Sequence, residues 1–393
     1  MNYVFISPAY PISCTRFCSS LRSLGVNVLG IGDVPYDTLN GELKAALSEY
    51  YYVSSLEDYD HLYRAAAFYI HKYGRIDILE SLNEYWLSTD ARLRTDFNIA
   101  SGPRENEIET LIKKSGMKKV FLEAGIPTAR QHKVSDLASG KAFASRVGYP
   151  LIVKPDIGVG ANGAMKLKSD EDLVSFCDRL PGIPYVMEEF LSGDICTYDA
   201  VIDSNCEPLV ESMCTYPSVL DTVQNDEDIW FYTKAEVPEK LRELGRKAVK
   251  AFAAGRRFVH FEFIHLSEDR EGIGKAGDYA IMEVNMRPPG GHDPDMINFA
   301  QSIDVFRIYA EMINTDRRLT PDSDDHYICA YAARKDGHVF THSHDEIMQR
   351  YGNDIVVQEE MPPIDWPAMG RYVYMAKFRE EAEMQRFFAF VLR

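Results

Sequence analysis

The sequence has few of the features that would indicate a disulfide-rich or membrane-bound protein. Its seven cysteines are spread over 393 residues and include no CxxC pair, which argues against a disulfide framework and against a cysteine-based metal site. No stretch approaches the roughly 20 apolar residues of a membrane-spanning helix, and the first residues lack the pattern of a secretory leader. We therefore expect free thiols, no membrane partner and a cytoplasmic location.

Basic residues are also scarce. Lysine and arginine number 43 against 60 aspartates and glutamates, giving a formal net charge of -17. Nucleic acids and anionic membranes attract basic surfaces, so neither is an expected partner. The sequence contains no GxxxxGK[ST] motif, which excludes a P-loop, and no GxG follows the first predicted strand, where a dinucleotide-binding fingerprint would stand. Any bound nucleotide would need locally placed positive charge.

What is present is the composition of a folded protein with several units. The apolar fraction is 46%, and the chain is too long for one compact core. Short apolar strands at residues 3–7, 27–31 and 76–80 alternate with helical patterns at residues 14–24, 43–50 and 61–73, which predicts an open α/β domain. Glu80, Asn83 and Glu84 follow the third strand, where they could receive a substrate amine or act as capping and surface groups.

The segment at residues 281–293, IMEVNMRPPGGHD, carries the strongest chemical signal. In an extended strand Glu283 and Asn285 point to the same side, and an antiparallel strand at residues 258–266 would bring Glu262 towards them. Oxygen ligands gathered in this way favour Mg²⁺ or Mn²⁺. Arg287 would add a fixed positive charge suited to a phosphate or a developing oxyanion. The alternative is a solvated hairpin with ordinary surface charges.

A second signal lies at residues 149–168, YPLIVKPDIGVGANGAMKLK. A strand delivers Lys154, and Gly158, Gly160 and Gly163 follow in a loop. The glycines match GxGxxG, but the next residues alternate like a returning strand, which favours a hairpin over a Rossmann turn. The backbone N–H groups of such a hairpin can fold over phosphates. A mobile surface hairpin with one partly buried lysine is the alternative. Four lysines at 113, 114, 118 and 119 are interpreted as a solvated helix face.

The order and spacing of these motifs resemble the ATP-grasp superfamily, specifically its carboxylate-amine ligases, which include L-amino-acid ligases and relatives of biotin carboxylase. The resemblance covers nearly the whole chain and includes Lys114, placed 11 residues before the turn at 125–127, and the EEFLSG segment at 188–193. It implies an α/β (α+β) ATP-grasp fold in four parts. These are an α/β domain at 1–105, a lid subdomain at 106–187, a large subdomain with the metal site at 188–320 and a carboxyl-terminal α/β unit at 321–393.

The resemblance also implies a role for each motif. Binding of ATP would involve a set of phosphate, loop and adenine residues: Lys114, Lys154, Gly158, Gly160, Gly163, Glu188, Glu189, Phe190 and Leu191. Glu262, Glu283 and Asn285 would hold Mg²⁺ or Mn²⁺, and Arg287 would be catalytic. Family members commonly have a glutamate two residues after the glycine of EEFLSG to bind the ribose. Ile195 stands there in this sequence, and the adjacent Asp194 is the candidate replacement.

The implied reaction joins a small carboxylate, such as an amino acid, to an amine through an acyl phosphate, with release of ADP and phosphate. A homodimer is expected from the resemblance alone. Two alternatives stay open: a nucleotide-binding ATP-grasp protein without ligase activity, and a carboxylase that works through an acyl phosphate of bicarbonate. The residues that select the substrates cannot be read from their order in the chain. Candidates are Glu84, Glu211, Tyr216 and His292.

Overall fold

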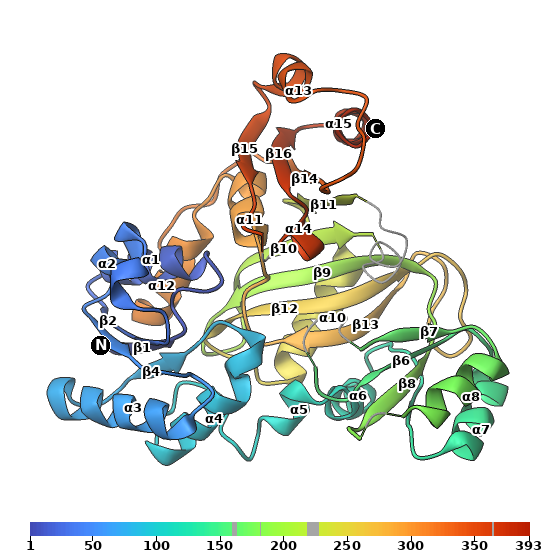
Figure 1. Ribbon diagram of the computed structural model, residues 1–393, viewed down its shortest axis with the longest axis horizontal. Helices are drawn as coiled ribbons and strands as arrows, with labels where there is room; N and C mark the ends of the chain where they lie inside the picture. The colour runs from blue at the N-terminus through green and yellow to red at the C-terminus, as the bar shows by residue number, and fades with distance from the viewer. Residues whose placement is uncertain (159–162, 181, 218–227, 364) are drawn as a thin grey trace.

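The computed structural model of the chain describes residues 1–158, 163–180, 182–217, 228–363 and 365–393. Its described strands form three sheets (Figure 1). A small parallel sheet from the first part of the chain lies on one side, a small antiparallel sheet lies on another, and a long eight-stranded sheet runs between them and on to the carboxyl-terminal segment. Two sheet-based parts therefore flank the central one.

The first part of the chain forms a parallel sheet with the strand order β3-β2-β1-β4. The elements are β1 (Asn2–Ile6), α1 (Cys14–Ser23), β2 (Asn27–Gly32), η1 (Tyr36–Thr38), α2 (Gly41–Ala46), β3 (Glu49–Tyr52), α3 (Tyr59–Tyr73), β4 (Ile78–Glu80), η2 (Glu84–Trp86) and α4 (Leu87–Asp96). This confirms the predicted open α/β arrangement. The helix predicted over residues 43–50 is wrong in its second half, because the tyrosine-rich segment after Ala46 forms β3, in keeping with the preference of aromatic residues for strands.

The second sheet has the order β5-β8-β6-β7 and is antiparallel. Its part of the chain comprises α5 (Glu109–Ile112), α6 (Lys114–Glu123), β5 (Gln131–Lys133), α7 (Leu137–Val147), β6 (Leu151–Pro155), β7 (Met165–Leu167), α8 (Asp170–Asp178) and β8 (Tyr185–Glu189). β6 and β7 pair as a hairpin, as the alternating pattern predicts, and no helix follows the glycine loop. The side chains of Asp136 and Ser169 cap the two helices that cover this sheet. We call this part the lid.

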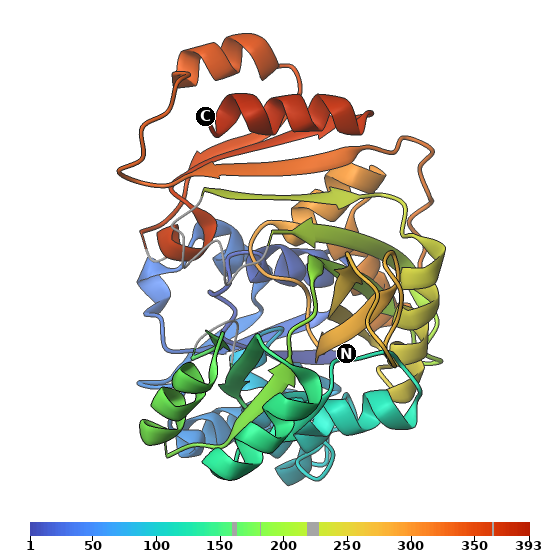
Figure 2. The same ribbon diagram turned by 90° about the vertical axis from the view of Figure 1, so that its right-hand side faces the viewer.

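The central sheet has the order β13-β12-β9-β10-β11-β14-β16-β15. Its strands are β9 (Gly193–Ile202), β10 (Pro208–Tyr216), β11 (Ile229–Lys234), β12 (Arg257–Leu266), β13 (Tyr279–Asn285), β14 (Ile328–Arg334), β15 (Ile355–Glu360) and β16 (Tyr372–Phe378). Its helices are α10 (Glu239–Ala251), α11 (Asp293–Gln301), α12 (Val305–Thr315), α13 (His344–Tyr351), α14 (Trp366–Met369) and α15 (Glu381–Val391). Figure 2 shows α13 and α15 at the end of the molecule opposite to the lid.

The sheets bear on the predicted division of the chain into four parts. β14, β15 and β16 continue the central sheet, so residues 321–393 do not form a sheet of their own. The boundary placed between residues 187 and 188 falls inside β8. The division itself remains a prediction. Among the described residues, no helix is both long enough and apolar enough to cross a membrane.

A close helix-to-sheet contact positions the central strands. Gly245 of α10 lies over the ring of Tyr198 on β9, and a Cβ atom at this glycine would be 2.3 Å from the ring. The ring cannot easily move, because it is fully buried and its hydroxyl donates a hydrogen bond of 2.6 Å to Glu211. Arg246 holds the same carboxylate from α10. A glycine is therefore needed where the helix crosses the strand.

We predict that Gly245→Ala lowers the free energy of unfolding by about 1–3 kcal/mol, because the added methyl group overpacks the contact with Tyr198. The sign is informative, since alanine in a helix interior is ordinarily the more stable residue by up to about 1 kcal/mol. Urea unfolding monitored by circular dichroism measures the change. Gly41→Ala is the control, because nothing lies within 4 Å of a Cβ atom at Gly41. A neutral or stabilising effect of Gly245→Ala would contradict the packing argument.

Candidate active site

The predicted metal-binding strands pair as expected. β12 and β13 are antiparallel, with Glu262 directly opposite Glu283 and His260 opposite Asn285. A bulge follows this pair, since Phe263 is opposite Ile281 and Met282 is the additional residue. Residues directly opposite one another in an antiparallel pair place their side chains on the same face of the sheet. The two carboxylates therefore share one site.

The donor set fits a magnesium ion. Burial raises the pKa of Glu283, and the nearby charge of Glu262 raises it further while Lys114 opposes the shift. Asn285 is buried, and among the described residues its side chain has no hydrogen-bond partner. The described part of the chain holds no group of three or more His, Cys, Asp or Glu side chains arranged to bind a metal. Two carboxylates and one amide would leave coordination positions for phosphate oxygens, as is usual for Mg²⁺.

Lys114 joins the lid to this site. It is the first residue of α6, and its Nζ atom lies 3.2 Å from Oε1 of Glu283. The same amine donates a hydrogen bond of 3.1 Å to the carbonyl oxygen of Gly158, at the start of the glycine loop. The backbone N–H of Lys114 donates to the carbonyl of Asp156 at 2.8 Å, which fixes the start of the helix against β6. One lysine thus contacts both predicted halves of the nucleotide site.

Next to this contact, Glu188 lies between two lysines. Its oxygens are 2.8 Å from Nζ of Lys154 and 2.9 Å from Nζ of Lys118, and Gln131 donates a third bond at 2.9 Å. Burial alone would raise the pKa of Glu188, but the two lysines lower it far below its usual range. Burial opposes protonation of Lys154, yet the charges of Glu188 and Glu283 raise its pKa. The lid lysine and the metal carboxylates therefore lie close enough to interact.

Lys118 was missed as a site residue. The sequence interpretation placed it on a solvated helix face, which is wrong, because it is buried and its pKa is lowered by burial. It also donates to Thr128 Oγ1 at 2.7 Å and to the carbonyl of Ala129 at 2.8 Å. The available signal was its spacing: it stands four residues after Lys114, on the same side of the helix.

The residues of the EEFLSG segment have different surroundings. Glu188 lies at the candidate site, whereas the next residues connect the lid to the central part. Glu189 turns away from Glu188 and forms ion pairs with Arg130 at 2.7 Å and Arg270 at 2.9 Å. Leu191 packs in a small apolar cluster with residues of the central part. Phe190 is half-buried under the amine of Lys166, 3.9 Å from the ring centre. Their backbone could still meet a base, but the Glu189 side chain is engaged in holding the lid.

The structure places some of the remaining residues that were predicted to bind the nucleotide. Gly163 has φ +75°, a conformation that favours glycine, and it lies where the loop rejoins β7. Gly160 lies outside the described residues. Asp194 is exposed on β9 opposite His265, and no side-chain partner is found for it in the described ranges. The ribose role of Asp194 therefore stays a prediction.

Arg287 faces the amino-terminal α/β part. Its Nη2 atom is 2.8 Å from Oε2 of Glu84, in the 3₁₀ helix that follows β4. The neighbouring candidates do not join it: Asn83 caps this 3₁₀ helix through the backbone N–H of Tyr85, and Glu80 is buried in an ion pair with Arg94. Of Glu80, Asn83 and Glu84, only Glu84 therefore contacts Arg287.

A histidine on β12, opposite Asn285, was also missed. His260 donates through Nδ1 to Asp199 at 2.7 Å, and its Nε2 atom is 3.6 Å from Glu262. Burial opposes the shift, but Asp199 raises the pKa of His260 to about 10. The signal for it was the alternation of His260 and Glu262 along one strand.

The other candidate specificity residues lie in two different places. Glu211 faces α10 and is bound to Tyr198 and Arg246, which places it on the opposite face of the sheet from His260. Tyr216 donates a hydrogen bond to Asp293, and His292 contacts Glu359 at 2.6 Å. Asp293 and His292 lie at the start of α11, shortly after β13.

Several known proteins are similar to parts of this chain. The family model for the carbamoyl-phosphate synthase L chain, ATP binding domain, matches residues 113–180. The uncharacterized protein y4rH of Sinorhizobium fredii is 21% identical over 245 residues, covering 57% of this chain and 46% of that protein. The L-arginine-specific L-amino acid ligase of Bacillus subtilis is 27% identical over 244 residues, covering 58% and 55%. The alignments thus span about half the length of these curated relatives.

Solved structures match over the whole chain. The L-amino acid ligase of Bacillus licheniformis has a TM-score of 0.71 at 16% identity, covering 99% of this chain and 96% of its own. The biotin carboxylase domain of Hydrogenobacter thermophilus 2-oxoglutarate carboxylase, solved with MgADP and bicarbonate, has a TM-score of 0.67 at 16% identity, covering 96% and 86%. At this level of identity, the matches show that the chain shares the fold of these solved structures. Both the resemblance seen in the sequence and the α/β (α+β) fold class are confirmed.

We predict that Glu188→Gln lowers the free energy of unfolding at pH 7 by about 3–5 kcal/mol, because two buried lysines lose their shared counter-charge. The pKa of Glu188 is depressed in the folded state, so its contribution is fully present above the unfolded value of about 4.3 and is lost as the pH falls towards the folded value. The gap between wild type and variant should therefore narrow in acid. Urea unfolding at pH 7 and pH 3 measures it.

Glu381→Gln is the matched control for this pair of measurements. Glu381 also pairs with a lysine, Lys234 at 2.9 Å, but it lies at the surface. An exposed pair contributes little, so we expect a change below about 1 kcal/mol at both pH values. A Glu188→Gln variant as stable as wild type at pH 7 would show that the lysines do not depend on this carboxylate.

Proposed function

We propose that this protein is an ATP-dependent ligase that joins a small carboxylate, such as an amino acid, to an amine through an acyl phosphate. The contact of Lys114 with Glu283 carries the proposal. A lysine suited to phosphates and a carboxylate suited to magnesium meet across the lid and the central sheet, beside the buried pair of Lys154 and Glu188. A triphosphate with a divalent cation would fit between Lys114 and Glu283, with its phosphates at the lysine and its cation at the carboxylate.

The nucleotide site would be assembled from both sides of this contact. Lys114 and Lys154 would neutralise phosphate oxygens, with the N–H groups of the glycine loop above them. Glu262, Glu283 and Asn285 would hold Mg²⁺, which when bound draws charge from the phosphates and orients them. Residues 188–191, at the connection between lid and centre, would border the adenine. Asp194 is the proposed contact to the ribose.

The chemistry would then need no protein nucleophile. An oxygen of the substrate carboxylate attacks the γ-phosphorus, the bond to the β-phosphate oxygen breaks, and ADP leaves. An amine attacks the carbonyl carbon of the acyl phosphate, loses a proton, and phosphate departs. Arg287 would stabilise the oxyanion of that tetrahedral stage, and closure of the lid would keep water from the acyl phosphate.

The names of the relatives support an amino acid as the carboxylate, since two of them are L-amino acid ligases. A carboxylase is the alternative suggested by the 2-oxoglutarate carboxylase domain. A protein that binds nucleotide without turnover is favoured only by Ile195, which pairs with Ile264 and offers no polar group to a ribose. A homodimer and a cytoplasmic location remain predictions.

We predict that the purified protein releases ADP only when both a carboxylate and an amine are supplied, and that Glu283→Gln lowers this rate by at least about 100-fold. A coupled ADP assay against pooled amino acids, with and without added amines, measures it. Glu268→Gln, on the exposed turn between β12 and β13, is the control and should keep full activity. Dependence on bicarbonate would favour the carboxylase. ATP binding by calorimetry without ADP release across the panel would sink the ligase proposal.

We predict that Arg287→Met lowers kcat by about 10²–10³, or about 2.7–4 kcal/mol, while ATP affinity stays within about threefold of wild type. The reason is that Arg287 lies at Glu84, on the amino-terminal side of the site, so the proposal places it at the acyl group and not at the phosphates. The Glu84→Gln variant keeps Arg287, so its kcat should fall by less than about tenfold. Steady-state kinetics with calorimetry for ATP separate the two effects. An equal loss of ATP affinity and kcat would place Arg287 at the nucleotide instead.

A further inference from the structure

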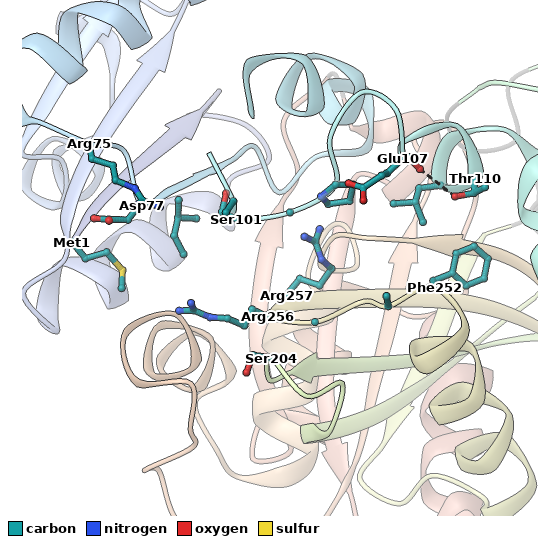
Figure 3. Close-up of a pocket in the computed structure, with 17 residues that line it drawn as sticks. Met1, Arg75, Asp77, Ser101, Glu107, Thr110, Ser204, Phe252, Arg256 and Arg257 are labelled. Carbon is teal, nitrogen blue, oxygen red and sulfur yellow. Dashed lines mark hydrogen bonds between the residues drawn. The ribbon is translucent and has the colours of Figure 1, made fainter. Parts of the chain in front are cut away.

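A hollow lies away from the candidate active site, between the amino-terminal α/β part and the central part (Figure 3). It is a cleft of about 830 Å³. Met1 and Ile78 line it at the amino-terminal ends of β1 and β4, whereas Glu84 follows the carboxyl end of β4. The cleft and the candidate active site are therefore at opposite ends of these strands. Nothing proposed above for the ligase reaction uses the cleft.

Arg257, the first residue of β12, lines this cleft and has only a distant, shared counter-charge. The residue is only 5% exposed, and its side chain forms no hydrogen bond with any described residue. Its single charged contact is with Glu80 Oε1 at 3.7 Å, which is too long for a hydrogen bond. The other oxygen of Glu80 is already 2.9 Å from Arg94. A buried guanidinium with five donors and no acceptor is costly, and calls for an anion.

The groups around Arg257 do not supply that anion. Arg94 takes one oxygen of Glu80 at 2.9 Å, and it also donates to the carbonyl of Leu79 at 3.0 and 2.8 Å and to that of Pro103 at 3.1 Å. Tyr3 and Tyr309 share a hydrogen bond of 2.9 Å, and burial raises the pKa of both hydroxyls, which stay neutral. One carboxylate thus serves two buried arginines.

The backbone beside Arg257 is shaped to admit the guanidinium. A Cβ atom at Gly102 would lie 2.6 Å from Arg257 Nη2 and 3.1 Å from Arg94 Cζ. Both guanidinium groups therefore lie directly against the chain at Gly102, where a side chain would displace them. In Figure 3, Arg257 points into the cleft towards the loop that holds Ser101.

Two further arginines border the same cleft. Arg256 has φ +49°, its Nη2 atom donates to the carbonyl of Ile313, and its buried Nε atom has no hydrogen-bond partner, with Asp316 at 3.6 Å. Arg75 is exposed at the rim. The acidic groups there are engaged, since Asp77 accepts from the backbone of Asn2 and Glu107 from that of Arg104. The cleft's charged lining side chains are these three arginines with Asp77 and Glu107, which leaves a small positive excess in a chain of net charge -17.

The geometry points to a second ligand site, one that binds a small phosphate monoester with its phosphoryl group on Arg257 and its organic part against the apolar wall. That wall is formed by Leu111 and Phe252, which belong to one apolar cluster. A phosphoryl group matches the planar donors of the Arg257 guanidinium. The volume suits a ligand the size of a sugar phosphate or an aryl phosphate, larger than a single ion.

Isothermal titration calorimetry of the full-length, nucleotide-free protein tests the site with ribose 5-phosphate, 4-nitrophenyl phosphate and inorganic phosphate. We expect at least one ester to bind about tenfold more tightly than inorganic phosphate, because only the ester reaches the apolar wall. Arg257→Gln should weaken that ester by at least about tenfold, and Arg75→Gln, at the exposed rim, by about threefold. Arg64→Gln, an exposed arginine on α3 outside the cleft, should bind like wild type.

The stability of the ligand-free protein distinguishes a ligand-binding role of Arg257 from a structural role. Glu80 keeps Arg94 in the Arg257→Gln variant, so its thermal midpoint should not fall below that of wild type. Equal ester affinity in wild type and Arg257→Gln overturns the proposal, as does equal affinity for ester and inorganic phosphate, which would mean an adventitious ion only. If Arg257→Gln does not fold, an unchanged affinity in Arg75→Gln overturns it. Because binding is measured without turnover, the result is independent of the ligase proposal.

Discussion

The structure depends on the balance of charge where the lid meets the central sheet. Lys114, Lys118 and Lys154 come from the lid side, and they meet Glu188 from β8 and the pair of Glu262 and Glu283 from the central sheet. Each of these groups would be costly to bury alone, and together they satisfy one another. In the proposed function, the phosphates and a divalent cation would take the place of these internal partners.

Much of this site was predictable because it follows strand periodicity. Glu283 and Asn285 alternate with apolar residues, and the turn between the strands is long enough for an antiparallel return, so the convergence of Glu262 with Glu283 follows from local rules. The hairpin after Lys154 was predictable for the same reason. Lys118 was not, because a lysine on a helix is ordinarily solvated, and only the fold shows that its face meets Glu188.

Contacts between parts distant in the sequence could not be predicted from patterns. Arg287 meets Glu84, and His260 meets Asp199, through the docking of separate elements. The cleft at Arg257 is a stronger case, since an arginine at the start of a strand gives no sign that its carboxylate partner is already bound by another arginine. Likewise, Glu189 looks identical to Glu188 in sequence, yet alternation sends it to Arg130 and Arg270.

The ion pair between Lys114 and Glu283 has a consequence for the order in which ligands enter. Without ligand, the lysine is the counter-ion of the carboxylate, so a free triphosphate would have to take the lysine and leave two facing carboxylates exposed to its own negative charge. A metal-bound nucleotide would meet no such obstacle, because it would bring a cation for the glutamates as it took the lysine. In the proposed ligase, this ion pair would therefore favour the preformed magnesium complex over the bare nucleotide.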